Sequence, residues 1–219
     1  MRPSRSKADR RHAVKAAVAR ADVRAPFVAL IILSLLLGFP ALCIAGVNYQ
    51  FGLESGGTWF FLYDKAFESV VAQPQVCYGA YFNVISDFEW ARNISLELSY
   101  LRSEGDGLIE PVKKTAKIRF HMISDRESAN VAYFFGGAVY DPYISGGLGS
   151  AHIEFQPQGR RAEDDWDFAV NVGGGVDFKL GKYFLLGGRL RYTWILPSGT
   201  LVKGHVSSLD TTLRVSLRF

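Results

Sequence analysis

Apolar and polar residues alternate along most of this chain, and the alternation is clearest in its last nine residues. Thr211, Leu213, Val215, Leu217 and Phe219 share one parity, and the residues between them are polar or charged. Since successive side chains of a β-strand point to opposite faces, this segment has one apolar and one polar face. The pattern predicts a strand that separates two different environments.

The same alternation predicts eight strands in all. They are expected near residues 47–54, 76–84, 94–100, 116–122, 143–153, 168–178, 184–194 and 211–219. In the segment 116–122, the apolar parity with Phe120 and Met122 is expected to face outward. Lys117, Arg119 and His121 are then expected to face inward.

Three properties favour a membrane-spanning barrel over a soluble sandwich. The apolar face is large and aromatic on nearly every strand, and the opposite face mixes small polar residues with charges of both signs. Expected strand lengths of roughly 9 to 11 residues match tilted strands that cross a membrane. Only closure satisfies the backbone hydrogen bonds of strands in lipid. The predicted fold is all-β: a closed, antiparallel, up-and-down transmembrane β-barrel of eight strands.

The connections between strands fit this topology with both termini in the periplasm. Long connections fall on one side, at residues 56–75, 101–114, 154–167 and 195–210. Two short ones fall on the other, at 85–93 and 179–183. The connection 124–142 is the exception, because residues 131–140 are apolar on both faces. It is either a periplasmic turn against the barrel or, with residues 58–63, an addition that makes ten strands.

Residues 1–45 are typical of a secretory signal peptide. Eight basic residues precede a 13-residue apolar run, 27–39, which Pro40 ends and small residues follow, up to Ala45. The run is shorter than the roughly 20 residues of a transmembrane helix. We expect cleavage after Ala45 and a barrel domain of residues 46–219; an uncleaved anchor helix and lipidation of Cys43 are the alternatives.

Removal of the leader changes the charge of the protein. The whole chain has 25 Lys and Arg against 21 Asp and Glu, or +4, and the leader holds 8 basic and 2 acidic residues, which leaves 17 against 19, or −2. The basic composition therefore gives no reason to expect nucleic acid as a partner. Cys77 is the only cysteine after the expected cleavage site, so no internal disulfide is expected.

The polar parity of the strands defines the expected interior of the barrel. Eight strands enclose a space just wide enough for side chains to fill, and opposite charges should pair there. A selective pore that attracts anions is the alternative. The expected interior charge network is Glu54, Glu97, Lys117, Arg119, Asp177, Arg189, Arg191, Arg214 and Arg218.

Aromatic residues near the strand ends indicate a girdle at a membrane interface. Its expected members are Trp59, Phe60, Phe61, Tyr63 and Trp194.

Three segments carry a family resemblance: DPYISGGLGSAHIEF (141–155), FAVNVGGGVDFKLGKYFLLGGRLRYTW (168–194) and LRVSLRF (213–219). They resemble the second half of the small outer-membrane β-barrel family, which includes opacity-type surface proteins and the transmembrane domains of OmpA-like proteins. The first half of the chain matches only in strand rhythm. The resemblance implies residence in a bacterial cell outer membrane, among outer-membrane lipid and lipopolysaccharide. It also implies that Leu213, Val215, Leu217 and Phe219 form the insertion signal that the barrel-assembly machinery recognises.

No catalytic, cofactor-binding or metal site is predicted. A lipid A acyl-hydrolase needs a nucleophile beside a base. His121, His152 and His205 remain after the expected cleavage, and residues 191–194 occupy the penultimate strand, where known lipid A deacylases carry His and Ser. We therefore expect a monomeric surface protein of structural or interaction type that meets an extracellular ligand through its loops. An acyl-hydrolase and a narrow ion channel are the alternatives.

Overall fold

Nine β-strands make up almost all of the described structure. The computed structural model describes residues 47–63, 67–86, 88, 91, 93–111, 118–158, 163–196 and 205–219, so the expected signal peptide lies outside the described residues. The strands are β1 (Val47–Tyr63), β2 (Phe67–Ala72), β3 (Gln75–Ser86), β4 (Ile94–Pro111), β5 (Ile118–Phe134), β6 (Tyr140–Pro157), β7 (Glu163–Lys179), β8 (Phe184–Leu196) and β9 (His205–Arg218). Within these ranges no helix has the length and apolar character to cross a membrane.

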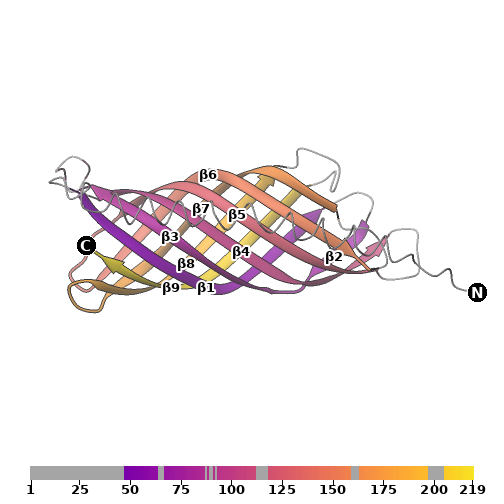
Figure 1. The fold of residues 1–219 in the computed structure, drawn as a ribbon, viewed down its shortest axis with the longest axis horizontal. Helices are drawn as coiled ribbons and strands as arrows, with labels where there is room; N and C mark the ends of the chain where they lie inside the picture. Colours follow the sequence, from indigo (N-terminus) through magenta and orange to yellow (C-terminus); the bar gives the residue numbers. More distant parts are fainter. Residues whose placement is uncertain are drawn as a thin grey trace, which may run out of the picture. The chain divides into compact units, whose positions relative to one another are not determined.

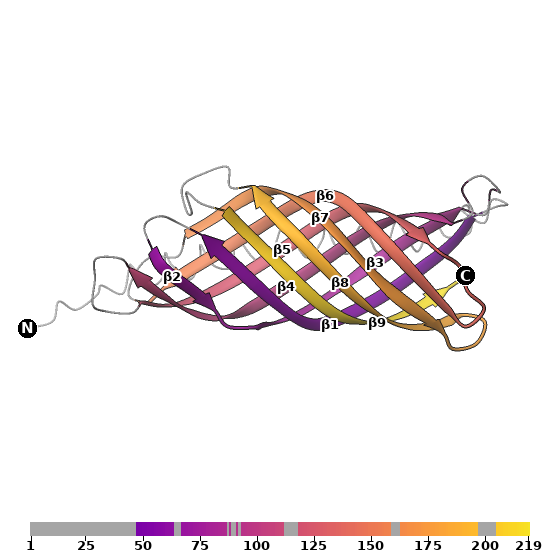
Figure 2. The same ribbon diagram turned by 180° about the vertical axis from the view of Figure 1, so that it is seen from behind.

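Eight of the strands close into a single antiparallel barrel, as Figure 1 and the reverse view in Figure 2 show. Their order around the barrel is β4-β3-β1-β9-β8-β7-β6-β5, and β5 pairs back with β4. First and last strands meet because β1 pairs with β9 from Gln50↔Arg218 onward. The prediction of an eight-stranded, up-and-down antiparallel barrel is confirmed.

The remaining strand, β2, extends the line of β3 along β4 and does not add a strand to the barrel. Both β2 and β3 pair with β4, with Ala72 opposite Gly107 and Val76 opposite Glu104. Gln73 and Pro74 separate them. Proline has no N–H to donate to the ladder, so the strand breaks there and resumes.

The strands are longer than predicted, and this removes the ten-strand alternative. The segment 58–63 is the end of β1, and the apolar stretch that begins at Val131 continues β5 as far as Phe134. The long connection expected at 124–142 is therefore a turn of five residues, 135–139, in which Gly136 has a φ of +70°. Glycine adopts this left-handed conformation without steric cost.

The strands are strongly staggered around the barrel. One row of paired residues starts at Gln50, runs through Asn83, Glu97, Asn130, Gly147, Asn171, Thr193 and Ser208, and returns to β1 at Phe60. The row returns ten positions further along β1, so each step from strand to strand climbs about one and a quarter residues. This stagger implies tilted strands, as in other closed barrels.

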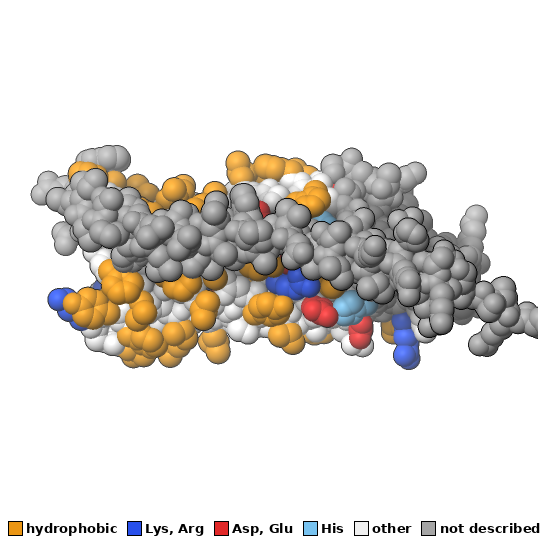
Figure 3. All heavy atoms as spheres, viewed as in Figure 1, with side chains coloured by type: hydrophobic (Ala, Val, Ile, Leu, Met, Phe, Trp, Pro, Cys, Tyr) orange, Lys and Arg blue, Asp and Glu red, His pale blue; other side chains and the backbone are white. Residues whose placement is uncertain are grey.

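Alternate side chains separate an apolar exterior from a filled interior. Leu53, Leu98 and Leu190 are more than half exposed on the outside, whereas Glu54, Glu97 and Arg189 are almost fully buried inside. We call the end with Tyr49 and Phe219 proximal and the opposite end distal. Figure 3 shows that hydrophobic side chains gather over the proximal half of the visible face.

The predicted orientation of the segment 116–122 is wrong for its described side chains, 119–122. Phe120 and Met122 are 2% and 1% exposed and point inward, while Arg119 is exposed on the outer surface and His121 shares its face. Further along β5, Val131 and Tyr133 carry the outward apolar face. The odd-numbered residues of β5 therefore face outward throughout, and the prediction followed the inward-facing apolar residues instead.

Candidate functional site: the barrel interior and its outer wall

A buried charge cluster fills the middle of the barrel. The Arg189 guanidinium donates hydrogen bonds to Glu54 and, at 2.7 Å, to Glu97. Arg214 donates to the other carboxylate oxygen of Glu97 at 2.9 Å. Thr212 completes the coordination of Glu54 with a hydroxyl donor at 3.1 Å. Because these side chains come from β1, β4, β8 and β9, they join strands on several sides of the barrel.

Arg214 is also enclosed by aromatic rings. Its guanidinium carbon lies 3.6 Å from the ring centroid of Tyr81, and it donates a hydrogen bond to the hydroxyl of Tyr143. Gly52 leaves the space that the Tyr81 ring occupies, since a Cβ at Gly52 would collide with that ring. A cation held over an aromatic face gains electrostatic attraction, more so when both are desolvated.

A second cluster lies one layer further toward the distal end. Arg126 donates to Asp210 at 2.9 Å and to the Thr58 hydroxyl at 3.1 Å. Arg191 donates to Asp210 at 3.2 Å, and the Thr58 hydroxyl donates to the same carboxylate at 2.7 Å. Asp210 thus accepts from two arginines, which offsets the cost of burying its charge.

A third cluster closes the proximal end. Asp141 forms ion pairs with Lys179 at 3.0 Å and with Arg218 at 3.3 Å. Asp177, on β7, accepts a hydrogen bond from the Gln50 amide at 3.3 Å.

Charges of the two signs balance in the described interior. Among the side chains that the structure describes, six basic and six acidic residues point inward. They are Arg126, Lys179, Arg189, Arg191, Arg214 and Arg218, with Glu54, Glu97, Asp141, Asp167, Asp177 and Asp210. The described interior therefore has no cationic excess that would draw anions through it.

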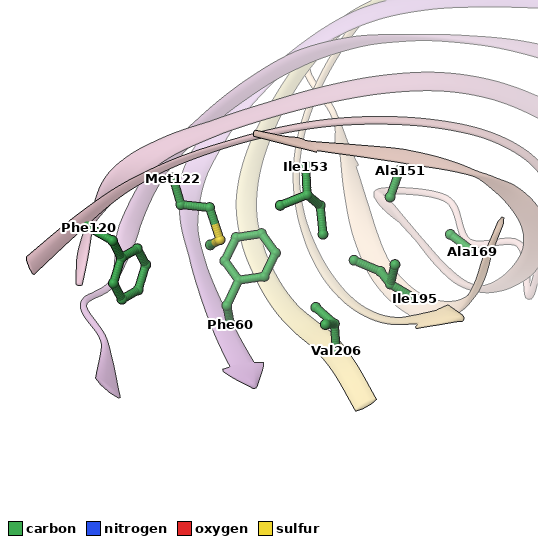
Figure 4. Packing of buried hydrophobic residues seen from close by; sticks show 8 residues of the cluster. All are labelled: Phe60, Phe120, Met122, Ala151, Ile153, Ala169, Ile195 and Val206. Carbon is green, nitrogen blue, oxygen red and sulfur yellow. The ribbon is translucent and has the colours of Figure 1, made fainter. Parts of the chain in front are cut away.

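An apolar layer follows the charged layers at the distal end of the interior. Phe60, Met122 and Ile195 are at most 4% exposed and belong to one cluster, drawn in Figure 4. Its other buried members are Phe120, Ala151, Ile153, Ala169 and Val206. Side chains from β1, β5, β6, β7, β8 and β9 thus close the barrel with hydrocarbon.

The structure brings most of the expected network residues together. Glu54, Glu97, Arg189 and Arg214 share one cluster, Arg191 reaches the second cluster, and Arg218 the third. Arg119 lies on the outside instead. Lys117 falls outside the described residues.

Sequence reasoning missed Arg126, Asp141 and Asp210. All three lie in segments taken for connections, 124–142 and 195–210, although they belong to β5, β6 and β9. Asp141 is the second residue of β6 and precedes the segment 143–153 that was expected as a strand. The signal that could have identified Arg126 is the outward parity of Val131 and Tyr133, extended back along the strand.

The girdle residues divide between the two faces. Trp59, Phe61 and Trp194 are exposed on the outer surface, but Phe60 is buried inside and cannot join them. Neighbouring residues of one strand cannot share a face, which explains the correction. The Tyr63 side chain lies outside the described side chains.

The outer wall carries a polar group on β4, β5 and β6. Asp125 faces outward, pairs with Arg102 at 3.1 Å and accepts a hydrogen bond from the Tyr100 hydroxyl at 2.6 Å. His152, directly opposite Asp125, lies 3.9 Å from its carboxylate and stacks on Trp166, with ring centroids 4.8 Å apart. Ser150 shares the outward face of β6 with His152.

This outer group contains the residue types of a serine hydrolase, but its carboxylate is held by other partners. A Ser–His–Asp site needs a hydrogen bond between nucleophile and base and another between base and carboxylate. The Asp125 carboxylate is bound by Arg102 and Tyr100.

A histidine with two acidic neighbours lies near the distal rim. The Nδ1 atom of His121 is 2.9 Å from Asp106, and its Nε2 atom is 3.2 Å from Glu104. The hydrogen bond to Asp106 raises the pKa of His121 above its usual value. Glu104 and Asp106 are exposed beyond the apolar part of β4, so these three residues lie in a solvated region.

The interior and the apolar exterior define a small closed β-barrel of the outer-membrane type. No protein-family model matches the sequence, and comparison with curated proteins finds no match. Neisserial surface protein A has a similar fold, with a TM-score of 0.54 and 15% identity over 80% of this chain and 98% of that chain.

Two further solved structures agree. Ail, the attachment invasion locus protein of Yersinia pestis, solved in complex with the heparin analogue sucrose octasulfate, gives a TM-score of 0.53 at 10% identity over 80% of this chain and 99% of that one. The outer membrane protein OprG from Pseudomonas aeruginosa gives 0.52 at 14% identity over 80% and 96%. The chain therefore has the fold of small outer-membrane β-barrels.

Proposed function

We propose that this protein is an integral outer-membrane barrel of structural, surface-contact type, with no chemistry of its own. Residues 1–45 act as the signal peptide, and residues 46–219 form the barrel domain. The proximal end faces the periplasm and the distal end faces the outside. Leu213, Val215, Leu217 and Phe219 present their side chains on the outer face of β9 and its end, which supports their role as the signal for the barrel-assembly machinery.

The observation that carries this proposal is the filled interior. Three layers of paired charges and one apolar layer occupy the space inside the eight strands. A conducting pore needs a continuous wet path, and an apolar constriction of this kind stops ions by excluding water. The paired interior charges, such as Glu54 with Arg189 and Asp141 with Arg218, act as a scaffold that holds the strands in register.

The distal strand ends and loops form the proposed contact surface. Loops held on a rigid barrel are suited to binding because they can vary without disturbing the scaffold. Ail was solved with a sulfated sugar analogue, which supports the idea that a barrel of this fold can meet an external ligand. For the present chain we propose an extracellular ligand at this end, with the barrel acting as a monomer.

Lipid hydrolysis is the second candidate, favoured by the group of Asp125, Ser150 and His152 on the outer wall. The hydrogen bonds that the Asp125 carboxylate accepts from Arg102 and Tyr100 count against it, because this carboxylate would have to orient the histidine. Some catalytic contacts tighten only with substrate bound, so activity must be measured directly.

The test uses the purified protein refolded in vesicles that contain lipopolysaccharide. A compact barrel should migrate differently on electrophoresis before and after boiling, and planar bilayers should show no stepwise currents. Release of fatty acid that disappears in His152→Ala would replace the proposal with the hydrolase. Regular single-channel steps would replace it with the channel, and a product that stays in solution without detergent would overturn membrane residence.

A further inference from the structure

The apolar belt around the barrel is interrupted on three adjacent strands. Arg102 and Glu104 on β4, Asp125 and Glu127 on β5, and Ser150 on β6 all face outward beside His152. We call these six residues the polar notch. Figure 3 shows that basic and acidic side chains occur on the distal half of the visible face, next to the hydrophobic region.

The notch lies at a height where the rest of the barrel is apolar. With a climb of about one and a quarter residues per strand, Ser150 is level with Trp194 on β8 and close to the level of Trp59 on β1. The strands that flank the notch are also apolar at this height. Val76 on β3 and Phe168 on β7 are 67% and 49% exposed.

The outward apolar run is consequently much shorter on this wall. On β4 it extends from Ile94 to Tyr100, whereas on β8 it extends from Phe184 to Leu196. With the usual rise and tilt of barrel strands, these runs cover about 15 Å and about 30 Å along the barrel axis. The usual apolar band is about 25 Å tall. A bilayer of normal thickness would bring hydrocarbon against the charged residues of the notch.

The contacts inside the notch leave polar groups that need a wet environment. Arg102 and Asp125 pair with each other, but Glu127 is exposed and forms no ion pair or hydrogen bond through its carboxylate with the other described side chains. Glu127 lies opposite Tyr100 and Ser150 in the two ladders. Neither residue can neutralise a carboxylate.

Aromatic residues mark the border of the notch and identify what covers it. Tyr78 on β3, Tyr100 on β4 and Trp166 on β7 are all exposed along this border. Tyrosine and tryptophan gather where hydrocarbon meets headgroups, because the ring is apolar and its polar atom can be hydrated. On β4 the border between hydrocarbon and headgroups is therefore at Tyr100, closer to the proximal end than Trp194 and Trp59.

We propose that outer-leaflet headgroups and water descend into the polar notch, so the bilayer is thinner beside β4–β6 than around the rest of the barrel. The occupant is a lipid surface, and the proposal rests on the membrane residence proposed above. Through this notch the protein would locally thin the leaflet and order the lipids nearest to it.

The test is site-directed spin labelling of the full-length protein in lipid vesicles, on a background with Cys43→Ser and Cys77→Ser. Single labels are placed at Ser150→Cys in the notch, at Trp194→Cys at the same height, and at Leu53→Cys in the middle of the belt. Collision with a water-soluble paramagnetic reagent and with oxygen reports the depth of each label. Unheated electrophoresis confirms that each variant is folded.

We expect the label at residue 150 to collide with the water-soluble reagent at least several-fold more often than the label at residue 194. Equal protection of both labels would mean that hydrocarbon covers the notch, and this would overturn the proposal. Protection at 150 with spin–spin broadening would identify a second copy of the chain as the occupant, which overturns it as well. Exposure at residue 53 would instead show that the barrel is not embedded, and the proposed function would fail first.

A second variant tests the chemistry of the notch. Glu127→Leu extends the apolar surface opposite Ser150, so the collision rate of the label at 150 should fall several-fold toward that at 194. Glu154→Leu, also on the outer face of β6 but beyond the notch, is the matched control and should leave the rate unchanged. No change with Glu127→Leu would overturn the role of the notch.

Discussion

The charged middle layer and the apolar distal layer occupy the same kind of space but hold the barrel together in different ways. In the middle layer, Glu97 stabilises the fold through its ion pairs, because Arg189 and Arg214 both pair with its carboxylate. In the distal layer, Met122 and Ile195 contribute through the volume that they fill. The first layer is specific and sensitive to the loss of one group, and the second tolerates changes that conserve apolar volume.

The largest expected effect comes from removing the shared acceptor of the middle layer. Glu97→Ala leaves Arg189 and Arg214 buried with one partner fewer each, and we expect a loss of about 3–5 kcal/mol of unfolding free energy. Urea unfolding of the protein in lipid vesicles, followed by tryptophan fluorescence, measures it. Glu154→Ala on the outer surface is the control, and an equal effect from both would remove the distinction between interior and outer-surface acids.

Truncation in the distal layer should cost somewhat less. Met122→Ala removes a fully buried side chain, and we expect about 2–4 kcal/mol, because the neighbouring side chains can partly close the cavity. Met122→Leu keeps the volume and should cost less than about 1.5 kcal/mol. If the leucine variant were as unstable as the alanine variant, volume would not be what this layer contributes. The same unfolding measurement applies.

Reciprocal exchanges of similar shape sharpen the comparison. Val206→Thr buries a hydroxyl in the apolar layer, and Thr212→Val removes the donor to Glu54 in the charged layer. Each should cost about 1–3 kcal/mol, since each leaves a buried polar group short of a partner. Unfolding midpoints of the two variants and of the double mutant should be additive. A stabilising Val206→Thr would show that the distal layer is wet.

The smallest effect lies outside both layers, at His121. Its pKa is raised by the hydrogen bond to Asp106, so protonated His121 favours the folded state. This contribution is complete below the unfolded pKa of about 6.5 and is lost as the pH rises through the higher folded pKa. An NMR titration of the imidazole should show the raised midpoint, and Asp106→Asn should lower it. A midpoint that does not respond to Asp106→Asn would contradict the pairing.

The fold could be predicted because alternation is a local property of each strand. The eight strands and the inward orientation of Glu54 and Arg189 follow from neighbouring residues alone. The inward face of β5 could not be predicted in the same way. Phe120 and Met122 are apolar, yet they lie inside, because the distal interior is itself apolar. A rule that assigns every apolar parity to the outside fails where the interior changes character along the barrel axis.

The partners of the interior charges could not be predicted either. Arg126 meets Asp210 across 84 positions of sequence, and Arg214 meets Glu97 across 117. These pairs depend on the stagger of the strands, which no single strand encodes. Asp210 was hidden for a different reason, since the strand that carries it begins well before the segment in which alternation is obvious.

The seam between β1 and β9 sets the order of events when the barrel forms. Tyr49 and Phe219 exchange backbone hydrogen bonds, N–H to carbonyl in both directions, at 3.1 and 2.8 Å. These two residues lie 170 positions apart in the sequence, so β1 and β9 each keep one unpaired edge until they meet. Such long-range closure is intrinsically slow, and until it occurs the sheet exposes two edges whose backbone N–H and C=O groups are unpaired. Until β1 and β9 pair, the unfolded chain must be kept from associating with other chains through these open edges. Closure of the barrel is therefore a single late step of folding.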